Sequence, residues 1–129
     1  MAKSLRIAVD FDGTCVVQTP MPGHGSDMPE AVETLQELAA AGHKLILWTC
    51  RVNHPTDPDN AQLDIAVRWF RDRNIPLAAV NENLPFTKEE WLWWNDIGGP
   101  RKVFADVYIE DKLPGGFPGW RFVREQILG

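Results

Sequence analysis

The sequence predicts an α/β fold, a three-layer Rossmann-like domain built on a central parallel sheet. First, apolar runs of strand length alternate along the chain with stretches of helical periodicity. Second, the order strand, helix, strand, helix, strand requires parallel strands joined by right-handed crossovers. Third, 129 residues with 44% hydrophobic side chains suit one compact domain, so we expect a single domain over 1–129.

The first expected strand and the first expected helix flank a long loop. The apolar run 5–9 predicts a buried strand that ends at Asp10. Two prolines and two glycines predict a loop or flap over 15–28. Apolar side chains at helical spacing then predict a helix over 29–40, with Asp27 as its candidate cap.

The remaining elements continue the alternation of strands and helices. We expect a strand over 44–48, a loop over 53–59, a helix over 61–73, a strand over 77–80, a helix over 88–95 and a strand over 107–109. The helix over 88–95 is indicated by Thr87 and Glu90, which have the spacing of a capping box. The tail, 121–128, fits either a strand turn or a closing helix.

Composition excludes several classes of protein. The net charge is −5 and the lysines and arginines are scattered, which argues against a broad nucleic-acid surface. No apolar run approaches the length of a membrane span, so no membrane partner is expected. Cys15 and Cys50 occur without an export signal, which favours reduced thiols and a cytoplasmic location.

Polar residues follow the expected strands. In parallel sheets, ligands bind beyond the carboxyl ends of the strands. The residues at those ends are Asp10–Asp12, Thr49–Arg51, Asn81–Asn83 and Glu110–Asp111. Three of these four ends carry acids, for which a purely structural sheet has no need.

The pentapeptide Asp10-Phe11-Asp12-Gly13-Thr14 is the strongest local signal. Carboxylates two residues apart at a strand end can face the same way, where they repel unless a cation or a proton relieves them. Gly13 permits a sharp turn, and the Thr14 hydroxyl can cap the turn or bind an oxyanion. An Asp-Gly turn alone is common, but the whole pentapeptide after an apolar strand favours a functional site.

Asp-Phe-Asp-Gly-Thr resembles the first motif of the haloacid dehalogenase superfamily, whose members are mostly phosphatases. The resemblance implies that Asp10 is the nucleophile that attacks phosphorus and that Asp12 is the general acid and base. The second aspartate distinguishes the phosphotransferase branch of that family from the dehalogenases.

The second family motif, an apolar strand ending in Thr or Ser, is similar to 45–49. By the resemblance, the Thr49 hydroxyl would hydrogen-bond a phosphoryl oxygen. Arg51 follows closely and is either a solvated surface charge or a ligand of the substrate phosphate or leaving group.

The third and fourth family motifs are a lysine and an acidic pair. Lys102 stands a few residues before the last expected strand and fits the lysine position, with Lys88 and Lys112 as competitors. Asp111 takes the position of a metal ligand, and Glu110 would assist it. The four motifs together span residues 10–111, so the resemblance covers nearly the whole chain.

The resemblance implies a Mg²⁺ cofactor held by Asp10, by Asp12 through its backbone carbonyl, and by Asp111. Ionised Asp10 and Asp111 with a phosphate bring roughly −4 of charge to the site. Mg²⁺ and Lys102 would return about +3. Hard oxygen ligands also suit Mg²⁺ better than zinc, and the sequence has no Cys/His ligand cluster.

These expectations combine into a phosphatase that hydrolyses a phosphate monoester through an aspartyl-phosphate on Asp10. The segment between the first two motifs holds only a flap and one helix, so the chain resembles a capless member of the haloacid dehalogenase (HAD) superfamily, an HAD-like domain with no large cap domain. An open site suggests a phosphorylated substrate able to cover it, either a macromolecule or a sizeable metabolite. Formation of a homo-oligomer could instead supply the lid.

Two rival functions remain. A phosphotransferase or phosphomutase on the same site would move phosphate between positions of the substrate without net release. A nonenzymatic interaction domain could use the tryptophans of the helix over 88–95, which are Trp91, Trp93 and Trp94. A receiver-type signalling domain ranks lower because its sequence lacks the Asp-x-Asp-Gly-Thr step.

For three further polar features, a structural role is favoured over a role in binding substrate. His24 is expected to be a solvated loop residue, with substrate contact as the alternative. The segment 81–83 is expected to form a turn, with binding of polar substrate groups as the alternative. Asp106 is expected to be structural.

Overall fold

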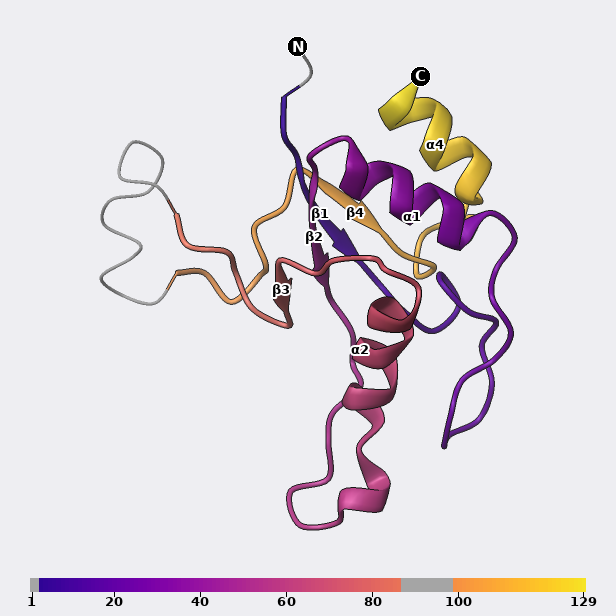
Figure 1. Ribbon diagram of the computed structural model, residues 1–129, viewed down its shortest axis with the longest axis vertical. Coiled ribbons are helices and arrows are strands. Elements are labelled where there is room, and N and C mark those ends of the chain that lie inside the picture. Colours follow the sequence, from indigo (N-terminus) through magenta and orange to yellow (C-terminus); the bar gives the residue numbers. More distant parts are fainter. Residues whose placement is uncertain (1–2, 87–98) are drawn as a thin grey trace.

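The computed structural model describes residues 3–86 and 99–129. Its centre is a four-stranded parallel sheet in the order β3-β2-β1-β4 (Figure 1). The strands are β1 (Arg6–Val9), β2 (Lys44–Leu47), β3 (Ala79–Val80) and β4 (Val107–Ile109). Within the described ranges no cap domain interrupts this sheet, so the α/β, Rossmann-like fold expected from the sequence is confirmed.

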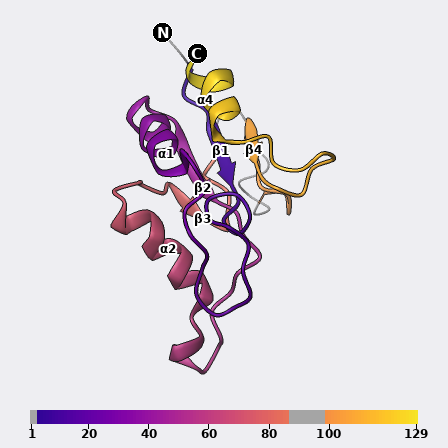
Figure 2. The same ribbon diagram turned by 90° about the vertical axis from the view of Figure 1, so that its right-hand side faces the viewer.

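Among the described residues, three α-helices pack against one face of the sheet, and Figure 2 shows α1 and α2 on the same side. They are α1 (Ala31–Ala40), α2 (Gln62–Asp72) and α4 (Trp120–Leu128), with a short 3₁₀ turn over Pro58–Asn60. The tail is therefore a closing helix. The predicted helix over 88–95, with its three tryptophans, lies outside the described residues.

The strand register aligns the ends of the three longer strands. Val9 is level with Leu47 on one side and with Ile109 on the other. The backbone N–H of Asp10 donates to the carbonyl of Ile109 at 2.9 Å, and that of Trp48 donates to the carbonyl of Val9 at 2.9 Å. The residues that follow the strands therefore meet at one edge of the sheet, as a shared ligand site requires.

The main core lies between the sheet and the helices. Alternate strand residues supply the sheet side of the core, and apolar helix residues supply the other side. The fully buried members include Ile7, Val9, Leu45, Leu47, Leu35, Leu38 and Phe70. Phe11 joins this core and meets Trp69 edge to face, with ring centroids 5.7 Å apart. This aromatic contact anchors the segment between Asp10 and Asp12 onto α2.

Loop residues cover part of the opposite face. Ala8 and Ile46 point away from the helices and pack against Val103, with the partly buried Leu84 and Tyr108 beside them. Successive residues of a strand face opposite sides of its sheet. A side chain two residues beyond Ala8 or Ile46 therefore emerges on this loop-covered face.

The predicted cap of the first helix is wrong. The residue at the cap position is Glu30, whose φ is 65° and whose side chain makes no capping hydrogen bond. The Asp27 carboxylate instead accepts a hydrogen bond from Trp69 Nε1 at 2.8 Å and pairs with Arg73 at 3.2 Å. Asp27 therefore ties the flap to α2, and α1 begins two residues later than expected.

Candidate functional site

Asp10 and Asp111 converge at the carboxyl edge of the sheet. Asp10 directly follows β1, and its carboxyl is within hydrogen-bond distance of the Asp111 carboxyl. The Thr14 hydroxyl donates to Asp10 Oδ2 at 3.1 Å, and Thr14 itself is fully buried. The first and last segments of the predicted constellation therefore come together in space.

The electrostatics of this pair are unusual. Burial first, and the hydrogen bond with Asp111 second, raise the pKa of Asp10 from 3.8 to about 7. The hydrogen bond from Thr14 acts in the opposite direction. Two carboxyls in contact must share a proton or bind a cation, because two adjacent negative charges repel strongly.

The donor set fits Mg²⁺ bound together with a phosphate. Asp10 and Asp111 bring two carboxylates together. Mg²⁺ commonly takes one or two carboxylates and completes its shell with waters and substrate phosphate. Across residues 3–86 and 99–129, no group of three or more His, Cys, Asp or Glu side chains could hold a metal ion. The residues therefore suit a cation shared with substrate rather than an all-protein cage.

Gly13 makes room for this convergence. Its φ of +81° belongs to the region that L side chains rarely adopt. A Cβ atom at this position would collide with the carboxylate of Asp111. Asp111 can therefore reach Asp10 only because residue 13 has no side chain.

Arg51 is buried and binds Asp12. Its Nε and Nη2 donate to the two carboxylate oxygens of Asp12, each at 2.7 Å. The Arg51 side chain is 1% exposed, and its guanidinium lies 4.9 Å from the centroid of the Phe11 ring. It also donates to the Gly23 carbonyl at 2.6 Å and to the Gln62 carbonyl at 3.3 Å. The solvated alternative for Arg51 is therefore wrong, and its guanidinium joins Asp12 to the flap and to α2.

Thr49 faces the same cavity as Asp10. The cavity has a volume of about 260 Å³, and its lining includes Asp10, Thr49, Trp48, Tyr108, Glu110 and Lys112. The Thr49 hydroxyl accepts from the Arg51 N–H at 3.1 Å, and the Thr49 N–H donates to Asn81 Oδ1 at 2.8 Å. Thr49 is thus fixed by its own turn and by the neighbouring strand end.

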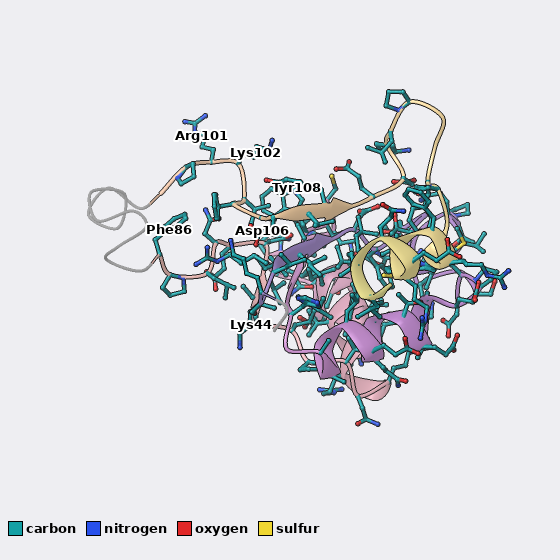
Figure 3. All side chains as sticks on the ribbon, turned by 90° about the horizontal axis from the view of Figure 1, so that it is seen from above. Lys44, Phe86, Arg101, Lys102, Asp106 and Tyr108 are labelled. Carbon is teal, nitrogen blue, oxygen red and sulfur yellow. The ribbon has the colours of Figure 1, made fainter. Side chains whose placement is uncertain are left out.

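Two of the three candidate lysines lie within the described residues, and they occupy different positions. Lys112 lines the cavity, and its Nζ lies 3.9 Å from Asp111 Oδ2. Lys102 stands on the loop that leads into β4, next to Arg101 (Figure 3). Its Nζ lies 5.0 Å from the centroid of the Tyr108 ring, so it adjoins the cavity through that ring. Lys88 lies outside the described residues.

Two residues that line the cavity were missed in the sequence. Trp48 is 36% exposed although it directly follows a buried strand. Tyr108 lies on the same face of the sheet, beside Ala8. The alternation of side chains along a strand could have indicated Trp48, because it lies two residues after Ile46, just as Asp10 lies two residues after Ala8. All four side chains are therefore on the same face of the sheet.

The remaining predicted polar residues have mainly structural contacts. Asn81 has φ 52° and holds Thr49, and the side chain of Asn83 accepts from the Phe104 N–H at 2.6 Å. Asp106 accepts from the Arg6 N–H at 2.8 Å, as its structural role predicts. The His24 ring meets Phe11 edge-on, with centroids 5.9 Å apart.

Neither cysteine forms a disulfide, in agreement with the expectation of unpaired thiols. Cys15 is buried and Cys50 is exposed. The Cys15 thiol donates to the Asp10 carbonyl at 3.3 Å, and burial raises the pKa of that thiol well above its usual value. Cys15 therefore supports the turn after β1 as a neutral thiol. Among the described helices, none is both long and apolar enough to cross a membrane.

Comparison with known proteins identifies a structural relative. No protein-family model and no curated protein matches the chain. A solved structure of a conserved protein from Bacteroides thetaiotaomicron matches with a TM-score of 0.77 and 36% sequence identity. The match covers 98% of this chain and 91% of the Bacteroides chain. The chain therefore belongs to the same family as this conserved Bacteroides thetaiotaomicron protein.

Proposed function

We propose that this protein is a Mg²⁺-dependent phosphatase that hydrolyses a phosphate monoester through an aspartyl-phosphate on Asp10. The observation that carries the proposal is the contact between the Asp10 and Asp111 carboxyls beside Thr49 at the carboxyl edge of the sheet. The resemblance of the surrounding motifs to the haloacid dehalogenase superfamily supports the same reaction.

Asp10, Asp111 and the Asp12 carbonyl are the groups that would hold Mg²⁺. When bound, the ion offsets the negative charge of the carboxylates and the phosphate, so that a dianionic substrate can approach a carboxylate nucleophile. The hydroxyl of Thr49 and the ammonium of a lysine would hold the phosphoryl oxygens during transfer.

In the first step, an Asp10 oxygen attacks phosphorus and the bond from phosphorus to the leaving oxygen breaks. The leaving oxygen takes a proton from Asp12. Both oxygens of Asp12 accept hydrogen bonds from Arg51, so Asp12 must release one of them to carry and donate a proton. Arg51 thus orients the Asp12 carboxylate.

In the second step, water attacks phosphorus and the bond from the Asp10 oxygen to phosphorus breaks. Asp12 accepts the proton from that water and is ready for the next cycle. Inorganic phosphate and the dephosphorylated alcohol are the products.

The assignment of the lysine follows from the cavity. We assign the phosphate-binding lysine to Lys112, which lines the cavity with Asp10. Lys112→Met should lower kcat/KM by about tenfold or more, as expected for loss of one charge contact to a phosphoryl oxygen. Lys102→Met should lower it less. A larger loss in Lys102→Met or Lys88→Met would transfer the role to that lysine.

The proposal also includes a setting for the reaction. Unpaired cysteines are typical of the cytoplasm, where we place the protein. The site has no cap over it within the described residues, so a sizeable metabolite, a macromolecule or a second copy of the chain would exclude water from it.

A phosphate-release screen tests the proposal. A broad panel of phosphate monoesters is assayed with Mg²⁺ and with a chelator, for the wild type and for Asp10→Asn. We expect release that requires Mg²⁺ and that is abolished in Asp10→Asn. Asp72→Asn, at the exposed end of α2, is the matched control and should retain activity.

Two outcomes would contradict the phosphatase. Equal activity in Asp10→Asn would remove Asp10 as the nucleophile. Transfer of phosphate between positions of a substrate without release would favour a mutase on the same site. Mass spectrometry of rapidly quenched protein should detect a phosphoryl group on Asp10 during turnover.

A further inference from the structure

The cavity at Asp10 is small for a complete substrate. Its volume of about 260 Å³ lies below the roughly 300–1,000 Å³ of ordinary small-molecule sites. A phosphoryl group fills part of this space beside Asp10 and Thr49. The rest of a substrate must therefore extend beyond the cavity.

Trp48 separates this cavity from a second hollow. The second hollow has a volume of about 290 Å³ and is lined by Trp48, Asn81, Glu82, Asn83, Pro100, Arg101 and Val103. Trp48 is thus a wall of both spaces, and a molecule that spans them must pass along its side chain. The two spaces together fall within the range of a small-molecule site.

Trp48 is placed to contact a ligand. Its side chain is 36% exposed, whereas Leu47 before it is fully buried. Its indole N–H makes no hydrogen bond to any residue in the described part of the chain. An aromatic face left open beside a catalytic cavity can stack on a planar ring of the substrate.

The second hollow has a fixed polar base. Asn81 Oδ1 accepts from the Thr49 N–H, which couples this hollow to the residue expected to bind phosphate. The Asn83 side chain donates to the Pro100 carbonyl at 3.2 Å and accepts from the Phe104 N–H at 2.6 Å. These bonds join the loop after β3 to the loop before β4. The distance from the phosphate position to the hollow is therefore set by the fold.

The second hollow is lined by one acidic and one basic side chain, Glu82 and Arg101. Glu82 and Arg101 are exposed, and neither forms an ion pair with a described residue. Figure 3 shows the Arg101 side chain projecting from the loop that leads into β4. A carboxylate accepts hydrogen bonds, a guanidinium donates them, and an amide does both, so the three groups together can bind the polar edge of a heterocycle.

We propose that Trp48 and this second hollow bind the leaving group of the substrate, and that the leaving group is a nucleoside. The inference rests on the proposed phosphatase. The base stacks on Trp48, and its polar atoms form hydrogen bonds with Glu82, Arg101 and Asn81. The phosphate lies beside Asp10 and Thr49, so the substrate is a nucleoside monophosphate.

A matched pair of substrates tests the inference. Adenosine and guanosine 5′-monophosphates are compared with ribose 5-phosphate, which lacks only the base. We expect kcat/KM for a nucleotide to exceed that for ribose 5-phosphate by about tenfold or more, the usual effect of one base stack. Trp48→Leu should remove most of this difference, and Trp48→Phe should keep most of it. Phe122→Leu, an exposed aromatic position on α4, is the control and should change neither rate.

A binding measurement separates this inference from the phosphatase itself. Calorimetry uses the Asp10→Asn protein with adenosine 5′-monophosphate and Mg²⁺, so it requires no turnover. We expect binding that weakens by about tenfold when Trp48→Leu is added.

The outcomes of the two experiments are distinct. Phosphate release without any preference for a base, or an equal loss on both substrates in Trp48→Leu, would overturn the nucleoside inference and leave the phosphatase standing. Nucleotide binding that depends on Trp48, in a protein that releases phosphate from no ester, would support the inference and overturn the phosphatase.

Discussion

At the scale of single residues, Gly13 decides whether the two carboxyls can meet. Gly13→Ala places a methyl group against the Asp111 carboxylate and costs about 1–2 kcal/mol in backbone strain at positive φ. We expect Mg²⁺-dependent phosphate release to fall at least a hundredfold, because Asp111 is displaced from Asp10. Phosphate release and urea unfolding measure the two effects.

Gly42→Ala is the control for Gly13→Ala. Gly42 has a φ of 92°, but a Cβ atom there would meet nothing within 4 Å. It should therefore carry a similar strain and leave activity intact. Equal activity in the two variants would show that the approach of Asp111 to Asp10 is unimportant.

Arg51 is the second residue on which the site depends. Arg51→Met leaves the Asp12 carboxylate, only 14% exposed, without its counter-ion. Loss of one partner of such a buried pair should cost about 3 kcal/mol, measured by urea unfolding. The double variant Arg51→Met/Asp12→Asn removes the unpaired charge and should recover part of that loss. A double variant that is less stable than the single one would contradict this account.

At the scale of elements, the sequence predicted β1, β2 and α2 to within one residue at each end, but it placed the starts of α1 and β3 two residues too early. β1 and β2 are short apolar runs, and burial on both faces leaves such runs few alternatives. α1 begins later than expected because Asp27 has stronger partners in Trp69 and Arg73 than in the helix terminus. These partners lie more than forty residues away, beyond the reach of any local capping rule.

The candidate site was predictable to a similar extent. The positions of Asp10 and Asp111 follow from strand order, because parallel strands bring their carboxyl ends to one edge. The partner of Arg51 was not predictable, since Asp12 lies 39 residues away and only the packed fold brings the two together. The roles of Asp10, Asp12 and Thr49 in catalysis stay predictions, as does the choice of Lys112 over Lys102 as the lysine that binds phosphate.

The closing helix α4 is also fixed by a contact between residues that are distant in the sequence. Trp120 is buried at its start, and its Nε1 donates to the Thr14 carbonyl at 2.7 Å. Trp120→Phe leaves that buried carbonyl without its donor, which should cost about 1–3 kcal/mol in the free energy of unfolding. Phe122→Leu on the same helix is half exposed and should change stability by less than about 0.5 kcal/mol. Similar losses in the two variants would show that the bond to Thr14 contributes little.

At the scale of the whole molecule, the Asp10 carboxyl couples stability to pH. Its pKa is about 7 in the folded protein and about 3.8 in the unfolded chain. Between these pH values the folded protein holds a proton that the unfolded chain has released. In the absence of metal, the Asp10 carboxyl therefore lowers the free energy of unfolding progressively as the pH rises from about 4 to about 7. Above pH 7 the destabilisation is complete.

Asp10→Asn removes this destabilisation, so the variant should unfold at a higher temperature than the wild type in chelator at pH 8. The difference in Tm should shrink toward pH 5, because Asp10 in the wild type is then mostly protonated. Mg²⁺ at pH 8 should raise the Tm of the wild type, since a ligand that binds only the folded state stabilises it, and should raise the Tm of Asp10→Asn much less. Asp72→Asn should behave like the wild type throughout. A wild-type Tm that does not respond to Mg²⁺ would mean that Asp10 and Asp111 do not form a cation site. An Asp10→Asn gain that does not vary with pH would mean that the pKa of Asp10 is not raised in the folded protein.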